Sequence, residues 1–211
     1  MHFLITAGGT REYIDPVRFI SNASSGKMGY CLAEAALKAG HTVTLISAPT
    51  NLKTPKKANL IQVTSSSEMF SAVKKTFKDC DCLIMAAAVS DYTVAKKSTV
   101  KIKKNDKQLT LHLKPTTDIL KWAGKNKKGR FIVGFALEDR AVRKNAEKKL
   151  VEKHLDMIIA NRPTAIGAEQ SSVEIKAAGN DWLKIKTAGK AAIAAKIIKL
   201  INAATSQVKH S

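Results

Sequence analysis

The 211-residue chain lacks any apolar run that approaches the ~20 residues of a membrane-spanning helix. It also lacks a basic start followed by a short apolar region, so we expect no signal peptide, no membrane partner and a cytoplasmic location. Its three cysteines are Cys31, Cys80 and Cys82. Their odd number, and the absence of a second Cys/His pair at ligand spacing, favour free thiols in a reducing compartment over disulfides or a zinc site.

Aromatic and acidic residues are scarce, whereas basic residues are abundant. The chain has two tryptophans and three tyrosines, and its 36 Lys and Arg residues outnumber 17 Asp and Glu residues, which gives a net charge of +19. Such a charge allows binding to nucleic acid. However, the lysines are spread along the whole chain, few aromatics are available to stack on bases, and no nucleic-acid-reading motif is present. A solvated basic surface is therefore the favoured interpretation.

Short apolar runs alternate with stretches of helical periodicity. The pattern predicts strands at 2–6, 42–46, 60–63, 82–89, 131–135 and 156–160. It predicts helices at 25–39, about 65–78, 117–126, 138–154 and 188–202. Strands separated by helices imply right-handed crossovers and a parallel sheet. We therefore expect an α/β fold, with a Rossmann-like, mostly parallel sheet and helices on both faces, in a single domain over residues 1–205.

Two segments interrupt the alternation. Residues 101–114 end in Leu109-Thr110-Leu111-His112-Leu113, a pattern typical of a strand, and predict a small β arm or hairpin. Residues 172–186 contain two short runs around Gly179-Asn180 and predict a hairpin at a sheet edge. Beyond the last helix we expect frayed residues, with a disordered tail at 206–211.

The two best-known glycine motifs for nucleotide binding are absent. Gly8-Gly9 follows the first strand, but Gly-x-Gly-x-x-Gly is missing and Ser47-Ala48-Pro49 stands where a dinucleotide fold would place an acid. In Ser25-Gly26-Lys27, the next residue is Met28 rather than the Ser or Thr of a P-loop. A nicotinamide dehydrogenase and a P-loop are thus disfavoured. What is left is a glycine turn and a helix amino terminus suited to phosphate, or an ordinary serine N-cap.

Three further groups each have a functional and a structural interpretation. Ala86–Asp91 follows the most apolar strand, where open α/β sheets bind ligands, and Asp91 could hold a metal or a ribose hydroxyl or could cap a turn. Lys101-Ile102-Lys103-Lys104, taken alone, is typical of a solvated charge run. Lys149 and Lys153 share one helix face, where surface solvation is again the default.

In this order, the motifs resemble phosphopantothenoylcysteine synthetase, a ligase family of coenzyme A biosynthesis. The most specific part is the opening signature, Thr6-Ala7-Gly8-Gly9-Thr10-Arg11-Glu12, Asp15-Pro16-Val17-Arg18, Asn22 and Ser24-Ser25-Gly26-Lys27-Met28-Gly29. The match continues through Ala87–Tyr92, Lys101–Lys104, Asp118–Leu120, Val133–Ala136 and Lys149 to Asn161, and it covers about residues 3–200.

The resemblance implies a ligase that joins 4′-phosphopantothenate to L-cysteine. The carboxylate of phosphopantothenate would attack the α-phosphate of CTP, and an acyl-cytidylate and pyrophosphate would form. The amine of cysteine would then displace CMP. ATP is the other possible nucleotide, and Mg²⁺ is the expected metal, with ligands that the sequence leaves unknown. The alternative is a basic nucleotide- or nucleic-acid-binding protein without ligase activity.

The resemblance also implies site residues. Asn22 would handle the acyl-nucleotide, Lys101 would stabilise charge at the phosphates, and Arg18 would assist phosphopantothenate binding. The expected nucleotide- and phosphate-binding positions are Gly8, Gly9, Thr10, Ser24, Ser25, Gly26, Ala87, Asp91, Lys101, Thr117, Asp118, Ile119, Leu120, Phe135, Lys149 and Lys153. The chain departs from the commoner family residues at Ser90 and at Thr116-Thr117.

Members of this family are dimers, so we expect a homodimer in which residues 101–114 act as an exchange arm or as a flap over the site. Most bacterial members carry an N-terminal flavin-dependent decarboxylase domain, whereas this sequence starts at the ligase. We therefore expect a stand-alone ligase that binds no FMN and a separate phosphopantothenoylcysteine decarboxylase in the pathway.

Overall fold

The computed structural model describes residues 1–106, 108–165 and 167–208. Its main strands are β1 (His2–Ala7), β4 (Thr42–Ser47), β5 (Asn59–Gln62), β6 (Cys82–Met85), β9 (Phe131–Leu137), β10 (Met157–Asn161), β11 (Gln170–Ala177) and β12 (Leu183–Gly189). Its α-helices are α1 (Lys27–Lys38), α2 (Ser66–Thr76), α3 (Ile119–Lys125), α4 (Val142–Glu152) and α5 (Lys190–Val208). Short 3-10 turns cover Phe77–Asp79 and Pro163–Ala165.

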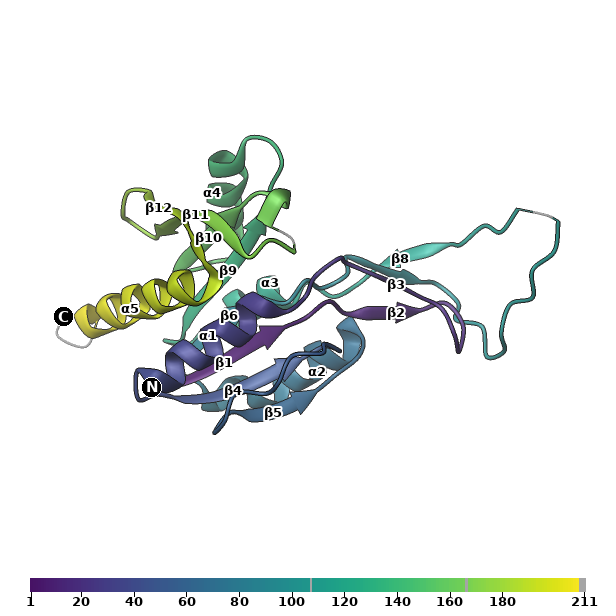
Figure 1. Cartoon of the computed structure of the whole chain (residues 1–211), viewed down its shortest axis with the longest axis horizontal. Helices are drawn as coiled ribbons and strands as arrows, with labels where there is room; N and C mark the ends of the chain where they lie inside the picture. Colours follow the sequence, from purple (N-terminus) through teal and green to yellow (C-terminus); the bar gives the residue numbers. More distant parts are fainter. Residues whose placement is uncertain (107, 166, 209–211) are drawn as a thin grey trace.

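The main strands form one sheet in the order β12-β11-β10-β9-β6-β1-β4-β5 (Figure 1). From β10 to β5 the neighbours pair in parallel, whereas β11 pairs antiparallel with both β10 and β12. The α/β class, the mostly parallel sheet and the hairpin at its edge, all predicted from the sequence, are confirmed. Two small antiparallel pairs lie outside this sheet: β2 (Arg11–Tyr13) with β3 (Phe19–Ser21), and β7 (Tyr92–Val94) with β8 (Leu113–Pro115).

Helices cover both faces of the sheet, as predicted. The core on one face contains side chains of α1 and α5, and the core on the other face contains side chains of α2, α3 and α4. Leu4 and Ile5 of β1 are both fully buried, one in each core, because successive side chains of a strand point to opposite faces. Burial of each such side chain stabilises the fold by about 2 kcal/mol.

The connections that follow β1 and β6 lie on opposite faces of the sheet. The helix after β1 is α1, whereas the helix after β6 is α3, and these two helices belong to different cores. Since β1 and β6 are neighbours in the sheet, their carboxyl ends flank a topological switch point. Open α/β sheets bind their ligands in the crevice at such a point.

The strand β6 is shorter than predicted. It ends at Met85 rather than at Val89. Beyond Met85 the next two amides leave the backbone ladder: the amide of Ala86 donates to the carbonyl of Ile84, and the amide of Ala87 donates to the side-chain hydroxyl of Thr6 in β1. The apolar composition of the run predicted a strand, but these hydrogen bonds turn the chain instead.

Two helix boundaries also differ from the prediction. The helix α4 begins late, at Val142, because the preceding Ala141 has a φ of 46°, which lies outside the right-handed helical region. The helix α5 continues to Val208, so residues 206–208 are helical rather than part of the predicted tail, and 209–211 lie outside the described residues. In the described part of the chain, no helix has both the length and the apolar character to cross a membrane.

The segment that precedes β8 extends away from the body of the molecule as an arm (Figure 1). The predicted strand at 109–113 is wrong for most of its length, because pairing with β7 begins only at Leu113. Isolated strands are marginal without a neighbour, so alternation alone does not produce one. The alternating side chains are left in solvent: Leu109 and Leu111 are 56% and 38% exposed.

Candidate functional site

Two glycines bring the turn after β1 close to its neighbours. Gly8 has a φ of 81°, in the left-handed region, and a Cβ built there would lie 2.8 Å from the carbonyl oxygen of Ala48. A Cβ on Gly9 would lie 2.8 Å from the carbonyl oxygen of Asn22. Larger residues do not fit at either position, so the turn is made of bare backbone, which allows a phosphate to approach closely.

The helix α1 begins at Lys27, later than predicted, and Gly26 is its N-cap residue. Ser24 and Ser25 therefore precede the helix rather than forming its first turn. The helix has no side-chain cap, and the two serine hydroxyls make only long contacts of 3.4 Å with the amides of Gly26 and Lys27. An ordinary serine N-cap is thus wrong. The first-turn amides and the positive end of the helix dipole are suited to an anion.

A third glycine, Gly29, sets the distance between α1 and β1. A Cβ on Gly29 would lie 2.6 Å from Cβ of Ala7 and 2.9 Å from the carbonyl oxygen of Thr6. The first turn of α1 therefore rests directly on the end of β1, beside the glycine turn.

Hydrogen bonds join the turn after β1 to the turn after β6. The amide of Thr10 donates to the carbonyl of Ala88 over 3.2 Å, and the amide of Ser90 donates to Oγ1 of Thr10 over 2.9 Å. Oγ1 of Thr6 accepts from the amide of Ala87 over 3.1 Å. The hydroxyl of Thr10 and the amide of Ala87, both at positions expected to bind the nucleotide, are thus engaged within the protein and brace the two turns.

Asn22 lies on the loop between β3 and α1, and the turn after β6 orients its side chain. Nδ2 of Asn22 donates to the carbonyls of Ala88 and Val89, each over 3.2 Å. Two carbonyl acceptors identify this end of the amide as the nitrogen. Oδ1 of Asn22 accepts no hydrogen bond from the part of the chain that the structure describes, which leaves it available to a donor from outside the chain.

The buried carboxylate of Asp15 ties Arg18 to the lysine run. Its Oδ2 accepts from Nε and Nη2 of Arg18, over 3.0 and 2.5 Å, and from the amide of Ile102, over 3.1 Å. Its Oδ1 accepts from the amides of Val17 and Arg18, each over 2.8 Å. The Arg18 guanidinium, assisted by these amides, holds the pKa of Asp15 well below its usual range. Lys101, next to Ile102, is exposed at the base of the arm.

The remaining expected nucleotide-binding residues form a second group on α3, β9 and α4. Nζ of Lys153 pairs with Oδ2 of Asp118 over 2.7 Å, and Nζ of Lys149 donates to the carbonyl of Phe135 over 2.8 Å. Burial lowers the pKa of Lys149, and the neighbouring Lys153 ammonium lowers it further. The carboxylates of Glu138, Asp118 and Asp91 act in the opposite direction on the pKa of Lys149.

Asp118, Ile119 and Leu120 have structural roles at the start of α3. Asp118 is the N-cap residue of the helix, and its Oδ1 accepts from the amide of Lys121. Burial is the largest single influence on the pKa of Asp118 and raises it, but the hydrogen bonds from Lys153 and from the Lys121 amide, together with the charges of Lys153 and Lys149, outweigh burial and lower the pKa. Ile119 and Leu120 are 2% and 7% exposed and pack in the core, so only their backbone can meet a ligand.

Sequence reasoning gave no role to Thr6 or Asp15, although both organise the site. Asp15-Pro16 followed by Arg18 does carry a local signal, since Asp commonly accepts from the amides two and three residues ahead in a turn. Nothing local indicates that Thr6 Oγ1 would support Ala87, which lies 81 residues away in the sequence.

The site offers limited protein ligands for a metal ion. The described residues contain no group of three His, Cys, Asp or Glu side chains placed to hold one. Mg²⁺ commonly takes only one or two carboxylates when phosphates and waters complete its octahedron. The exposed carboxylate of Asp91, near the switch point, fits that requirement.

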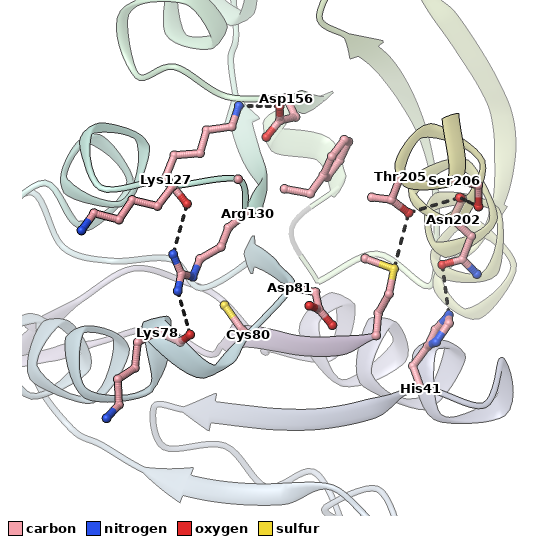
Figure 2. Close-up of a pocket in the computed structure, with 14 residues that line it drawn as sticks. His41, Lys78, Cys80, Asp81, Lys127, Arg130, Asp156, Asn202, Thr205 and Ser206 are labelled. Atoms are coloured by element: carbon pink, nitrogen blue, oxygen red, sulfur yellow. Dashed lines mark hydrogen bonds and ion pairs between the residues drawn. The ribbon is translucent and has the colours of Figure 1, made fainter. Parts of the chain in front are cut away.

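Two cavities lie at opposite ends of the strands of the sheet. One, of about 440 Å³, adjoins the glycine turn and is lined by residues that include Arg11, Tyr30, Ser47, Ala48 and Thr50. The other, of about 780 Å³, lies at the amino-terminal ends of the strands (Figure 2). It is lined by residues that come just before β1, β4, β6, β9 and β10, and by residues in the last turns of α5. The larger cavity contains none of the predicted site residues.

Two basic side chains of the larger cavity, Arg130 and Lys127, already have structural roles. Arg130 donates to the carbonyls of Phe77, Lys78 and Lys127. It thereby provides hydrogen-bond donors for backbone carbonyls in the segments that follow α2 and α3. Lys127 in turn forms an ion pair with Asp156 (Figure 2). We therefore place the functional site at the carboxyl edge of the sheet, with the smaller cavity beside it.

The fold and the site define a Rossmann-like α/β protein with a glycine turn and a helix amino terminus, both suited to an anion, at its switch point. Residues 1–204 match a family model described as the DNA/pantothenate metabolism flavoprotein C-terminal domain. The chain therefore belongs to this family, and the family membership that the sequence motifs predicted is confirmed.

Individual relatives agree with this assignment. The chain is 49% identical over 168 residues to the coenzyme A biosynthesis bifunctional protein CoaBC of Bacillus subtilis, which covers 79% of this chain and 41% of that protein. It is 43% identical over 203 residues to a cysteine/cysteine sulfinic acid decarboxylase from an unknown prokaryotic organism, covering 93% of this chain and 56% of that protein. The chain thus spans only about half of the length of these relatives.

Solved structures show the same fold. The crystal structure of the C-terminal domain of a coenzyme A biosynthesis bifunctional protein CoaBC has a TM-score of 0.85 at 36% identity, and the match covers 100% of this chain and 96% of that one. The DNA/pantothenate metabolism flavoprotein from Streptococcus pneumoniae has a TM-score of 0.84 at 28% identity, with 96% of this chain and 99% of that one covered.

Proposed function

We propose that this protein is a phosphopantothenate–cysteine ligase that uses CTP and Mg²⁺ and releases CMP and pyrophosphate. The observation that carries the proposal is the convergence, at the carboxyl ends of β1 and β6, of a bare-backbone turn, an uncapped helix amino terminus and an oriented Asn22 amide. The lysine run is tied to the loop between β2 and β3, which leads on to Asn22. The family membership supports it, because relatives such as the Bacillus subtilis protein are coenzyme A biosynthesis proteins.

The first half of the reaction activates a carboxylate. A carboxylate oxygen of phosphopantothenate attacks the α-phosphorus of CTP, the bond to pyrophosphate breaks, and an acyl-cytidylate forms. Lys101 and the amino terminus of α1 would offset the negative charge that gathers on the phosphates, and Mg²⁺ carried by the nucleotide would offset more of it. Asp91, Lys149 and Lys153 would border the nucleotide on the side of α3 and α4.

The second half transfers the acyl group to cysteine. The amine attacks the acyl carbonyl, the bond to CMP breaks, and the amine loses a proton. Because Nδ2 of Asn22 is held by two carbonyls, its Oδ1 would accept a hydrogen bond from the incoming amine. An aspartate at this position would place negative charge 3.2 Å from the same two carbonyls and would leave that orientation.

The arm supports a homodimer. Val100, Leu109 and Leu111 are 70%, 56% and 38% exposed, and apolar side chains at such density in an extended segment are typical of a protein interface. A second copy of the chain would cover these side chains and would bring its own arm toward the first site. Replacing Leu109 and Leu111 by lysine should shift the mass measured by light scattering to that of a monomer, and an unchanged dimer would argue against this interface.

Purified protein with phosphopantothenate, cysteine, CTP and Mg²⁺ should release pyrophosphate and CMP in equal amounts. Omission of any component should stop CMP release, and a parallel assay with ATP measures the preference for the base. Absence of pyrophosphate release with both nucleotides would refute the ligase. Asn22→Asp should give one equivalent of pyrophosphate per site and then stall before cysteine transfer, whereas Asn180→Asp, in the distant turn between β11 and β12, should turn over normally. Normal turnover by Asn22→Asp would remove Asn22 from its role.

A further inference from the structure

The lysine run stands at the base of an arm that otherwise projects from the molecule (Figure 1). Both backbone groups of Ile102, inside this run, are nevertheless fixed. Its amide donates to Oδ2 of Asp15 over 3.1 Å, and its carbonyl accepts from Nη2 of Arg18 over 2.8 Å. Asp15 and Arg18 also bind each other, so the three residues close a ring of hydrogen bonds.

Two neighbouring contacts fix the chain that leads to this ring. The amide of Ser98 donates to the carbonyl of Ile14 over 2.9 Å, and the ammonium of Lys97 lies 5.3 Å from the ring centre of Tyr13. The base of the arm thus runs along the loop between β2 and β3. The same stretch of chain leads on through β3 to Asn22 and α1.

Asp15 is the group that holds this arrangement together. Its carboxylate is fully buried and accepts five hydrogen bonds: three from backbone amides and two from one guanidinium. A buried carboxylate with this many donors has a defined position, because loss of any of them leaves polar groups without partners. Unlike Arg18 and Lys101, Asp15 has no exposed surface with which to touch a ligand.

We propose that Asp15 is a positioning residue that, through Arg18 and the backbone of Ile102, fixes Lys101 and Lys103 beside the loop between β2 and β3. This inference rests on the proposed ligase function, in which Lys101 meets the phosphates. Two lysines at the start of an untethered arm would sample many positions, whereas lysines on either side of a fixed residue are pre-organised. Misplacement of a catalytic group by about 1 Å can cost on the order of 100-fold in rate.

The Asp15→Asn substitution keeps one acceptor oxygen of the side chain and replaces the other oxygen by an amide nitrogen. The amide oxygen of asparagine can still accept from the amides of Val17 and Arg18, so the turn is kept. The amide nitrogen would replace Oδ2, and it would face three N–H donors that it cannot accept from. The variant should therefore fold but release Ile102. Asp106→Asn, at an exposed position farther along the arm, is the matched control.

Two measurements test the inference. Hydrogen exchange at the Ile102 amide, resolved by NMR, should accelerate at least tenfold in Asp15→Asn and stay unchanged in Asp106→Asn. The kcat of pyrophosphate release should fall roughly 10- to 100-fold, with the KM for cysteine unchanged. In a Lys101→Arg background the Asp15→Asn substitution should cost clearly less in kcat, because both changes act through one group.

Each result has a distinct meaning. Unchanged exchange at Ile102 would show that Asp15 does not hold the arm. Faster exchange with unchanged kcat, or full additivity with Lys101→Arg, would show that the tether does not position the lysines. Because exchange is measured without substrate, absence of ligase activity in the wild type refutes the proposed function and is distinguishable from failure of the tether. If Asp15→Asn does not fold, Arg18→Lys removes the planar fork that reaches the Ile102 carbonyl, and the same exchange criterion applies.

Discussion

The close packing of α1 on β1 predicts that Gly29→Ala destabilises the protein and impairs the site. The added Cβ would lie 2.6 Å from Cβ of Ala7 and 2.9 Å from the carbonyl oxygen of Thr6. Carbon atoms in favourable contact are about 3.5–4.0 Å apart, so the shortfall is roughly 1 Å. The neighbours belong to a central strand and cannot rotate aside, and therefore α1 must move away from the sheet.

The expected size of the effect follows from two opposing contributions. Overpacking of a core costs about 1–3 kcal/mol, and the better helix propensity of alanine offsets about 1 kcal/mol of this cost. The net loss of up to about 2 kcal/mol corresponds to a fall in Tm of up to about 8 °C for a protein of this size. Because the amino terminus of α1 moves with the helix, nucleotide turnover should also fall by roughly tenfold or more.

Thermal unfolding followed by circular dichroism, together with CMP release, measures both effects. Gly189→Ala is the matched control, because Gly189 has an ordinary φ and a Cβ there would meet no atom within 4 Å. Its Tm should stay within about 1 °C of the wild type. If Gly29→Ala also keeps the wild-type Tm and the wild-type turnover, the site does not depend on the contact between α1 and β1.

Two further predictions concern ionisable groups. The indole N–H of Trp182 and the neighbouring Lys176 ammonium hold the pKa of Glu147 below its usual value of 4.5. The ionised Glu147 therefore stabilises the fold above the unfolded-state pKa, and this stabilisation is lost as the pH falls through the folded-state pKa. Glu147→Gln should therefore lower Tm near neutral pH, and the effect should shrink as the pH falls below the unfolded-state pKa and vanish once the folded-state carboxylate is protonated. A difference in Tm that stays constant as the pH is lowered would contradict the charge argument. Cys80 and Cys82 are buried, and burial raises the pKa of Cys80 to about 12. Titration with a thiol reagent should therefore find only Cys31 reacting in the native protein and all three cysteines reacting after denaturation. Fast reaction of more than one thiol in the native protein would show that the core opens readily.

Most of the fold could be predicted from the sequence because its signals are local. Apolar runs such as Phe3–Ile5 and Leu83–Met85 sit between helical stretches, and this alternation determines a parallel sheet with helices on both faces. The predictions that were wrong concern segments whose structure depends on residues distant in the sequence. The apolar run after Met85 turns because the Thr6 hydroxyl takes the Ala87 amide, and the alternating run before Leu113 has no strand to pair with.

The location of the site could be predicted for the same reason, but its internal connections could not. Gly8, Gly26 and Asn22 lie in a short signature whose residue types by themselves indicate a phosphate turn. The bond between Asp15 and Ile102 joins residues 87 positions apart, and no local pattern indicates it. Ile119 was predicted to contact the nucleotide from its position in a motif, yet its side chain packs in the core.

The position of β1 in the sheet has a consequence for how the protein is made. Among the strands of this sheet, β1 is the first to leave the ribosome, and it lies between β4 and β6. One of its edges can pair once residues 42–47 have emerged, but the other waits for residues 82–85. During this interval a nascent chain carries an open, apolar strand edge, the surface that most readily recruits strands from other chains. Translation that pauses before residue 82 should therefore be the step of synthesis most sensitive to aggregation and most dependent on chaperones.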